Sequence, residues 1–444
     1  MIKTLQKSMR EYKKVSWITV FLSAFEVVFE IVIPLCMSGL IDNGIEGGVM
    51  SMVWKYGLIL LCLAVFQMVT GMLAAFLGAR ASAGFGANLR SDMYDNVQTF
   101  AFSNIDKFST ASIVTRLTTD VTNVQNAFQM LIRLAIRGPS MLIFAMIVSF
   151  RISRQISLIF VAVIPVLAAL LALIVLKVHP VFKRVFHTYD ELNNIVQENV
   201  RGIRVVKSFN QEEHEIGKFE KVSEKIYRDF AKAERLISLN APVMQVCVYT
   251  CMILISWFGA KAVIASGNNA ALGLTTGSLT ALFTYAMQIL MSLMMLSMVF
   301  AMMVIASSSA QRIAEILNEK TDISNPDDPV LEVKDGEIDY RNVEFAYASK
   351  ADTKVLENIN VHIASGETVG IIGGTGSSKS SFVQLIPRLY DVTGGEVTLG
   401  GADVRKYDLD TLRNAVAMVL QKNELFSGTI AENLRWGNEN ATDE

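Results

Sequence analysis

A glycine- and serine-rich segment near the carboxyl end carries the residues best suited to phosphate chemistry. It reads Gly373, Gly374, Thr375, Gly376, Ser377, Ser378, Lys379, Ser380, Ser381. Glycines let successive backbone N–H groups turn toward one anion, Lys379 can reach the β- and γ-phosphates, and the Ser380 hydroxyl is a ligand for Mg²⁺. The spacing therefore predicts a nucleoside triphosphate site with these residues as its cradle.

The prediction requires a buried strand before the loop and a helix after it. The apolar run 367–372 predicts a covered strand, and residues 380–389 predict a helix whose N-terminus attracts phosphate. One position departs from the pattern G-x-x-x-x-G-K-[ST], because Ser378 stands where the pattern has glycine. A Cβ at that point is expected to crowd the phosphate or strain the turn, which puts nucleotide affinity in question. The alternative is a flexible Gly/Ser loop with a chance lysine, and the surrounding pattern disfavours it.

The composition points to a membrane protein. The chain has 444 residues, of which 52% are hydrophobic and 18% charged, against about 25% charged in ordinary soluble domains. Six stretches are long enough to cross a bilayer, which takes about 20 apolar residues each. They are residues 17–40, 52–77, 127–150, 156–178, 241–265 and 279–306. The net charge of −2, with no basic patch carrying interleaved aromatics, gives no support to nucleic-acid binding.

Charge placement predicts the orientation of these spans. Residues 1–16 are basic, which favours a cytoplasmic N-terminus lying as an amphipathic segment on the inner surface. The loops 41–51 and 266–278 lack Lys and Arg, as outer loops should. Arg151 and Arg154 disagree, since they fall in a turn assigned to the outside. The long inner connections, 78–126 and 179–240, are expected to be membrane helices continuing into the cytosol.

Two features inside the spans admit two interpretations each. Glu26 and Glu30 lie four apart on one helical face, and they either receive a cationic amphipathic cargo or pair with polar groups of neighbouring helices. The last span is rich in methionine, which suits either a path for varied substrates or the filling of gaps between helices. Those methionines are Met287, Met291, Met294, Met295, Met298, Met302 and Met303.

Cysteine and histidine spacing predicts neither a disulfide framework nor a zinc site. The four cysteines, Cys36, Cys62, Cys247 and Cys251, fall inside apolar runs. The four histidines, His179, His187, His214 and His362, are scattered and form no ligand spacing.

Taken together, the loop and the six spans resemble an ATP-binding cassette (ABC) exporter half-transporter over essentially the whole chain. The fold implied is a six-helix membrane domain followed by part of an α/β nucleotide-binding domain. Residues 342–347 look like the family's strand ending in an aromatic, which would place Tyr347 against adenine. Residues 419–434 are similar to its glutamine loop, with Gln421 reaching Mg²⁺ and the attacking water. The expected boundaries are 1–16, 17–310, a linker 311–335, and 336–444.

The resemblance also implies how the parts communicate. Residues 108–121 resemble the first coupling segment, and a second coupling helix is expected near 211–216. ATP and Mg²⁺ would be the cofactors. A second half-transporter, identical or related, would complete a dimer in the cytoplasmic membrane. This dimer would contact the membrane lipids and move a drug, lipid or peptide outward.

No signature motif, acidic strand with a catalytic glutamate, or switch histidine follows Gln421. A hydrolase needs a positioned base, so we expect this sequence, as a fragment or a truncated product, to bind nucleotide without turning it over. A catalytically silent regulatory subunit is the alternative function. An importer permease fits less well, because importers usually keep membrane and nucleotide chains separate.

Overall fold

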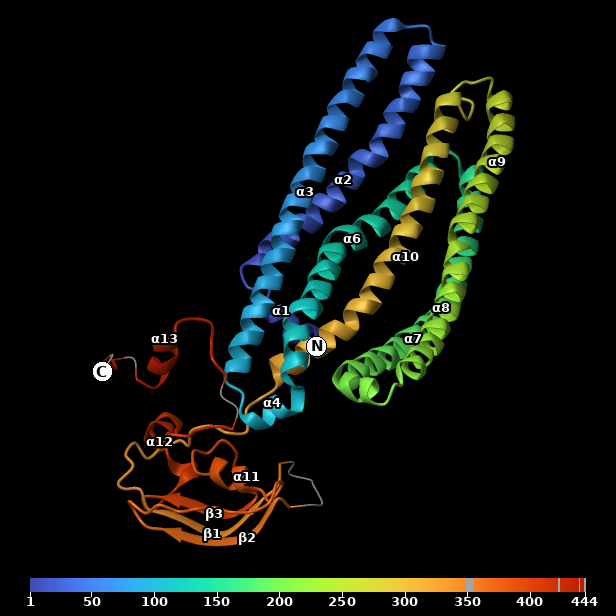
Figure 1. Cartoon of the computed structure of the whole chain (residues 1–444). Helices are drawn as coiled ribbons and strands as arrows, with labels where there is room; N and C mark the ends of the chain where they lie inside the picture. The colour runs from blue at the N-terminus through green and yellow to red at the C-terminus, as the bar shows by residue number, and fades with distance from the viewer. Residues whose placement is uncertain (348–353, 422–423, 439, 443–444) are drawn as a thin grey trace. The chain divides into compact units, whose positions relative to one another are not determined.

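The computed structural model describes residues 1–347, 354–421, 424–438 and 440–442. The chain divides into two compact units: residues 1–91 with 118–314, and residues 92–117 with 315–444. Figure 1 shows the helices of the first and the small sheet of the second. Each unit is described by itself.

The first unit is built mainly from long helices. Its helical segments are the short α1 (Ile2–Lys7) and the π-helical η1 (Leu40–Glu46), and the long α2 (Tyr12–Gly39), α6 (Val121–Ile152), α7 (Arg154–Ser208), α8 (Glu212–Ser238) and α9 (Asn240–Ser266), with most of α3 (Met50–Gln98) and α10 (Thr276–Asn318). Among the described residues, six helical segments are long and apolar enough to span a membrane, which confirms the six predicted spans.

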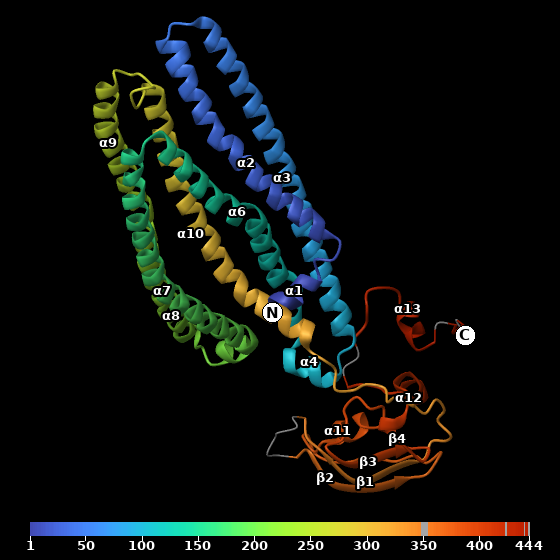
Figure 2. The same ribbon diagram turned by 180° about the vertical axis from the view of Figure 1, so that it is seen from behind.

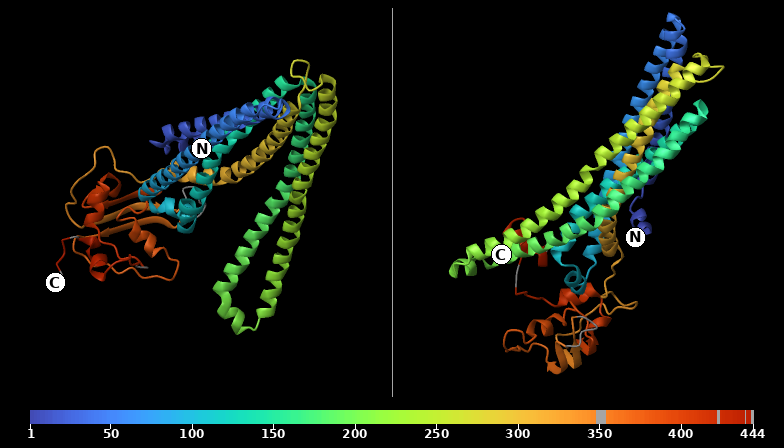
Figure 3. Two further views of the ribbon diagram at one scale, coloured as in Figure 1. Left: turned by 90° about the horizontal axis from the view of Figure 1, so that it is seen from above. Right: turned by 90° about the vertical axis from the view of Figure 1, so that its right-hand side faces the viewer.

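Local sequence explains where several helices begin and end. Ser153 starts α7, because its side chain accepts a hydrogen bond from the backbone N–H of Ile156 at 3.5 Å. Gly267 ends α9 in the left-handed region, at φ +60°, where glycine has no Cβ penalty. Helices α3 and α7 are 49 and 55 residues long, more than the about 20 residues that cross a bilayer, and the extension of the spans into the cytosol stays a prediction. Helices α7 and α8 lie side by side in both views of Figure 3.

The core of the first unit is apolar and joins several helices. It includes Val27 of α2, Phe160 of α7, Ile255 of α9 and Tyr285 of α10, all fully or almost fully buried. The Tyr285 hydroxyl donates to the backbone carbonyl of Ile31 at 2.6 Å, so its polar end is satisfied inside the apolar layer. This packing holds α2 and α10 together.

The second unit contains a small antiparallel sheet with helices on one side. Its strands are β1 (Ile338–Phe345), β2 (Leu356–Ile363), β3 (Gly394–Leu399) and β4 (Ala402–Asp403), in the order β2-β1-β3-β4 among the described residues. Its helices are α4 (Phe102–Phe108), α5 (Thr110–Thr115), α11 (Lys379–Gln384), η3 (Val404–Lys406), α12 (Leu409–Ala415), α13 (Ile430–Leu434) and η4 (Arg435–Gly437), while η2 (Arg116–Asp120) joins the units. Figure 2 shows α11 and α12 on the same side of the sheet.

The core of this unit lies between the sheet and those helices. The ring of Tyr340 in β1 stacks on Phe382 of α11 with centroids 4.1 Å apart, and its hydroxyl donates to the Phe382 carbonyl at 2.8 Å. Tyr407 donates to the carbonyl of Leu399 in β3 at 2.7 Å. Helix α11 is thereby fixed against β1, which holds the end of the phosphate loop in place.

The expected covered strand at residues 367–372 is wrong. These residues form no strand, and Ile372 is 97% exposed. A buried parallel strand needs hydrogen-bonding neighbours and helices over both faces. The described strands pair with one another in antiparallel fashion and supply no such neighbour, so the apolar sequence of 367–372 does not decide its structure.

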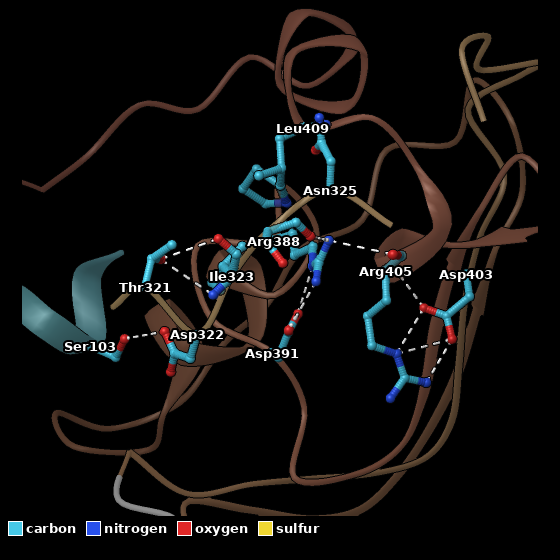
Figure 4. A network of polar contacts seen from close by, with 12 residues as sticks. Ser103, Thr321, Asp322, Ile323, Asn325, Arg388, Asp391, Asp403, Arg405 and Leu409 are labelled. Atoms are coloured by element: carbon cyan, nitrogen blue, oxygen red, sulfur yellow. Dashed lines mark hydrogen bonds and ion pairs between the residues drawn. The ribbon is translucent and has the colours of Figure 1, made fainter. Parts of the chain in front are cut away.

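Polar contacts fix residues 322–325, which precede β1, to other parts of the second unit. Figure 4 shows Asp322 accepting from Ser103 of α4 at 2.9 Å, and Asn325 near Leu409. Arg388 donates to the backbone carbonyl of Ser324 at 3.2 Å, and the Asn325 side chain accepts from the backbone N–H of Leu409 at 2.9 Å. Residues 322–325 are therefore ordered by contacts at several points.

Candidate functional site

The phosphate loop folds around its own lysine. The Lys379 ammonium donates to the carbonyls of Gly373 and Gly374 at 2.8 and 2.7 Å, and to the Ser377 hydroxyl at 3.2 Å. These contacts hold the ammonium beside the loop, where it can pair with a phosphate bound there. The loop predicted from the sequence thus forms one continuous cradle from Gly373 to Lys379.

Backbone conformation explains why the departing residue matters. Ser378 has φ +61°, the left-handed region that glycine enters freely and a residue with a Cβ enters at a cost of roughly 1–2 kcal/mol. Gly376, two residues earlier, has φ +84°, with open space where a Cβ would stand. The turn has positive φ at position 378, which explains why the pattern G-x-x-x-x-G-K-[ST] has glycine there. This chain has serine instead.

Two predicted ligands from distant parts of the chain meet beside the loop. The Gln421 side-chain amide donates to the Ser380 hydroxyl at 2.9 Å. Tyr347, at the end of the β1 segment, shares a hydrogen bond of 2.8 Å with the Ser381 hydroxyl. Tyr347 is half-exposed. Lys379, Ser380, Ser381, Gln421 and Tyr347 thus form one cluster.

The cradle fits a phosphate chain in its shape and donor set. A Cβ on Gly373 would come within 2.6 Å of the Ser377 hydroxyl and fill the cradle, whereas one on Gly374 would meet open space. The Ser380 hydroxyl and the Gln421 side-chain oxygen are the neutral oxygen ligands that Mg²⁺ accepts. The residues present therefore match a nucleoside triphosphate with its metal ion.

Comparison with known proteins agrees with this geometry. Residues 16–294 match the model of the ABC transporter transmembrane region, and residues 356–444 match that of the ABC transporter. The chain belongs to the ABC transporter family. It is 31% identical to the uncharacterized ABC transporter ATP-binding protein YfiB of Bacillus subtilis, over 98% of this chain and 74% of that protein. It is 29% identical to the ATP-dependent lipid A-core flippase of Syntrophus aciditrophicus, over 84% of this chain and 60% of that protein.

The predicted fusion of membrane and nucleotide-binding regions is therefore confirmed for this ABC transporter. It is a multi-pass membrane protein whose nucleotide-binding region lies on the cytoplasmic side, and the family model implies ATP binding. The individual residue roles inside the cradle stay predictions.

Sequence reasoning missed an aromatic cluster that joins the cradle to α4. Tyr390 lies 5.2 Å from Tyr347 and 6.0 Å from Phe102 of α4, measured between ring centroids. Its hydroxyl donates to Asp106 of α4 at 2.7 Å. Burial raises the pKa of the Tyr390 hydroxyl, and the bond to Asp106 raises it further, so the group stays a donor at neutral pH.

The coupling role of residues 108–121 stays a prediction. The predicted segment, 108–121, begins where α4 ends, and it is α4 that contacts Tyr390. A lone tyrosine on a short loop carries no distinctive spacing, so only the fold could pair it with Asp106.

The intramembrane carboxylates of the transporter have a partner that sequence reasoning did not name. Arg137 of α6 lies 3.4 Å from Glu26 and 2.9 Å from Glu30, measured between guanidinium nitrogen and carboxylate oxygen. Of the two interpretations left open, pairing with a neighbouring helix is thus observed. One guanidinium serves two carboxylates.

A second cluster missed from the sequence brings one histidine beside two carboxylates on the sheet. His362 of β2 lies directly opposite Asp339 of β1, with 2.7 Å between imidazole Nδ1 and carboxylate oxygen, and Glu337 is 3.7 Å away. The hydrogen bond to Asp339 raises the pKa of His362, and that same bond lowers the pKa of Asp339. The side chains of His179 and His187 lie outside the described residues, while His214 lies on α8.

Proposed function

We propose that this chain is one subunit of an ATP-driven exporter that moves an amphipathic or hydrophobic molecule outward across the cytoplasmic membrane. The observation that carries the proposal is the meeting of Lys379, Ser380 and Gln421 in one cradle. The same chain supplies six membrane spans, so the energy source and the path belong to one polypeptide. The boundaries 1–16, 17–310, 311–335 and 336–444 remain our proposed domain limits.

Each cradle residue has a proposed role. Backbone N–H groups from Gly373 to Ser378 and the Lys379 ammonium would hold the phosphates, Ser381 would support them, and Tyr347 would stack on adenine. Ser380 and Gln421 would hold Mg²⁺, and Gln421 would also orient the attacking water. Bound Mg²⁺ neutralises phosphate charge as it builds up during transfer.

Contacts at the cradle support a mechanical link to the membrane helices. Tyr390 touches Tyr347 on one side and α4 on the other, and Lys107 of α4 pairs with Glu319 at 2.8 Å. Adenine stacked on Tyr347 would therefore restrict a ring packed against Tyr390. In this way nucleotide binding would bias the position of α4, a step that a two-state motor requires.

The substrate class is proposed as drug, lipid or peptide, with lipid favoured by one comparison. The relatives include flippases named for lipid A-core. A methionine-rich α10 is compatible with a path for lipid tails, since thioethers adapt to varied shapes.

The chain is proposed to work as a dimer, with a related rather than identical partner. Ser378 strains its own loop, so this cradle would be the weaker of two nucleotide sites. A nucleotide-binding subunit without turnover is the second candidate, and the same strained position favours it. Vanadate-sensitive ATPase activity in lipid would separate the exporter from the silent subunit.

The proposal is tested by binding a fluorescent ATP analogue to the chain in lipid nanodiscs. Lys379→Ala should weaken binding about ten-fold or more, because the phosphates lose their cation. Ser378→Gly should tighten binding several-fold, because the loop no longer holds a Cβ at positive φ. Lys406→Ala, an equal change of charge on the exposed η3 turn, should leave binding unchanged.

Two results would count against these assignments. Binding that Lys379→Ala leaves intact would show that the cradle is not the nucleotide site. Unchanged affinity in Ser378→Gly would remove the basis for a weak site and a different partner.

A further inference from the structure

Three side chains with the chemistry of metal ligands meet on one face of the small sheet, where β1 begins and β2 ends. Asp339 of β1 and His362 of β2 are direct partners in the antiparallel register. Glu337 stands two residues before Asp339, the spacing that puts side chains on the same face of an extended chain. Strand pairing therefore joins one imidazole and two carboxylates, although Asp339 and His362 are 23 positions apart.

The distances between the three ligand atoms suit one small ion. Imidazole Nδ1 of His362 lies 2.7 Å from the Asp339 carboxylate and 3.7 Å from that of Glu337. All three ligand atoms lie within 4.8 Å of one another. Ligand atoms in a tetrahedral Zn²⁺ site, each about 2.0–2.1 Å from the ion, are about 3.3 Å apart. The two distances from Nδ1 lie on either side of that value, so small side-chain rotations would close the three groups around an ion.

Neighbouring contacts hold two of the ligands in place. The Arg341 guanidinium donates to one oxygen of Asp339 at 3.1 Å, while the other oxygen faces His362. The backbone carbonyl of Glu337 accepts from the N–H of Gly400 at 2.8 Å, which ties this residue to the end of β3. Outer contacts of this kind orient the ligands of protein metal sites. The cluster is therefore partly arranged for an ion in advance.

Charge and donor type select a divalent transition-metal ion. The two carboxylates supply two negative charges, and Arg341 beside them is shared with Glu396, so it compensates them only in part. A ligand set of imidazole nitrogen and carboxylate oxygen suits Zn²⁺, whereas Mg²⁺ keeps to oxygen ligands and octahedral geometry. The side chains of His362 and Glu337 are 59% and 42% exposed, so an ion can enter from water and keep water as a further ligand.

We propose that Glu337, Asp339 and His362 form a site for one Zn²⁺ ion on the exposed face of the sheet. The ion would replace the proton of the hydrogen bond between His362 and Asp339, and it would join the start of β1 to the end of β2. The site shares no residue with the phosphate cradle and goes beyond the proposed export function. Histidine spacing does not reveal it, because its ligands meet only through strand pairing.

The test titrates Zn²⁺ into the full chain in lipid nanodiscs without nucleotide, and it follows the heat of binding and the hydrogen exchange of the β1 and β2 amides. At ten times its dissociation constant, Zn²⁺ should raise the protection of these amides about ten-fold, because the ion binds only the paired strands. His362→Ala and Glu337→Gln should each weaken Zn²⁺ binding about ten-fold or more. Glu337→Gln keeps the bond between His362 and Asp339, so a merely structural pair would not respond to it.

Two control variants and a second ion separate the site from the general charge of the surface. Glu332→Gln makes the same change of charge at an exposed position outside the cluster, and His214→Ala removes an exposed histidine from α8. Both should bind Zn²⁺ as the unaltered chain does. Mg²⁺ at the same concentration should leave the protection of the β1 and β2 amides unchanged, because it does not favour a nitrogen ligand.

Three outcomes would overturn the site. The first is Zn²⁺ affinity that His362→Ala or Glu337→Gln leaves intact, and the second is amide protection that Zn²⁺ does not change. The third is equal protection by Mg²⁺ and Zn²⁺, since screening of negative charge would then explain the effect. None of these outcomes bears on the proposed export function, which is tested by nucleotide binding at the cradle.

Discussion

Two sets of carboxylates in the membrane unit, Asp120 and the pair Glu26 and Glu30, differ in how they are paired with arginine. Asp120, at the start of α6, is fully buried and accepts from Ser309 at 2.8 Å and from the Nε of Arg312 at 2.7 Å, with the Arg312 Nη2 also in contact. Glu26 and Glu30 instead share the guanidinium of Arg137.

The difference shows two ways of pairing a carboxylate in the membrane unit. A buried charge is tolerated when it is paired and its remaining oxygens accept hydrogen bonds, as at Asp120. At Glu26 and Glu30 a single guanidinium bridges two carboxylates of one helix, so its loss affects both at once.

The largest effect is expected from Arg137→Gln. Both Glu26 and Glu30 lose their counter-ion, which should destabilise the unit by about 4 kcal/mol at neutral pH. Thermal unfolding in detergent measures the loss, and adding Glu26→Gln and Glu30→Gln should recover most of the stability. Full stability in Arg137→Gln alone would show that the pairing contributes nothing.

A somewhat smaller effect is expected from Arg312→Ala. Asp120 would stay buried but lose the guanidinium that pairs with it, at a cost of about 3 kcal/mol. Asp120→Asn in that background removes the stranded charge and should return part of the stability. The same thermal measurement applies. A double variant that is no more stable than Arg312→Ala would show that the stranded charge of Asp120 does not cause the loss.

The smallest effect is expected at the exposed pair of His362 and Asp339. The pKa of His362 is raised by its hydrogen bond to Asp339, so its contribution is present at low pH and is lost as the pH rises through the raised value. The pKa of Asp339 is lowered, so its contribution is lost only as the pH falls through that lowered value. Protection of the β1–β2 amides from hydrogen exchange should therefore decline from about pH 5 to about pH 8.

His362→Ala serves as the matched control for that prediction. Its amide protection should be independent of pH over the same interval once intrinsic exchange is corrected. A decline of the same size in both proteins would assign the pH dependence to another group.

The membrane helices and the phosphate cradle could be predicted because each depends on local sequence. About 20 apolar residues suffice to specify a span, and glycine spacing before Lys379 suffices to indicate a phosphate loop. Whether residues 367–372 form a strand could not be predicted from local sequence. A covered strand needs neighbours that come from elsewhere in the chain, and the described sheet does not provide them.

Contacts between residues that lie far apart in the chain could not be predicted from the sequence either. Tyr390 and Asp106 are 284 positions apart, and no periodicity links them. Arg137 sits within an apolar run that predicts a span, and nothing in that run says which carboxylate its guanidinium meets.

The sequence by itself determined the six spans, the phosphate loop and the unusual Ser378, since apolar length and residue spacing are properties of short segments. Only the tertiary structure decided that Glu26 and Glu30 share Arg137 and that Asp120 pairs with Arg312. The physical reason is that ion pairs form between side chains on different helices, and the packing of those helices sets which charges lie within reach of one another.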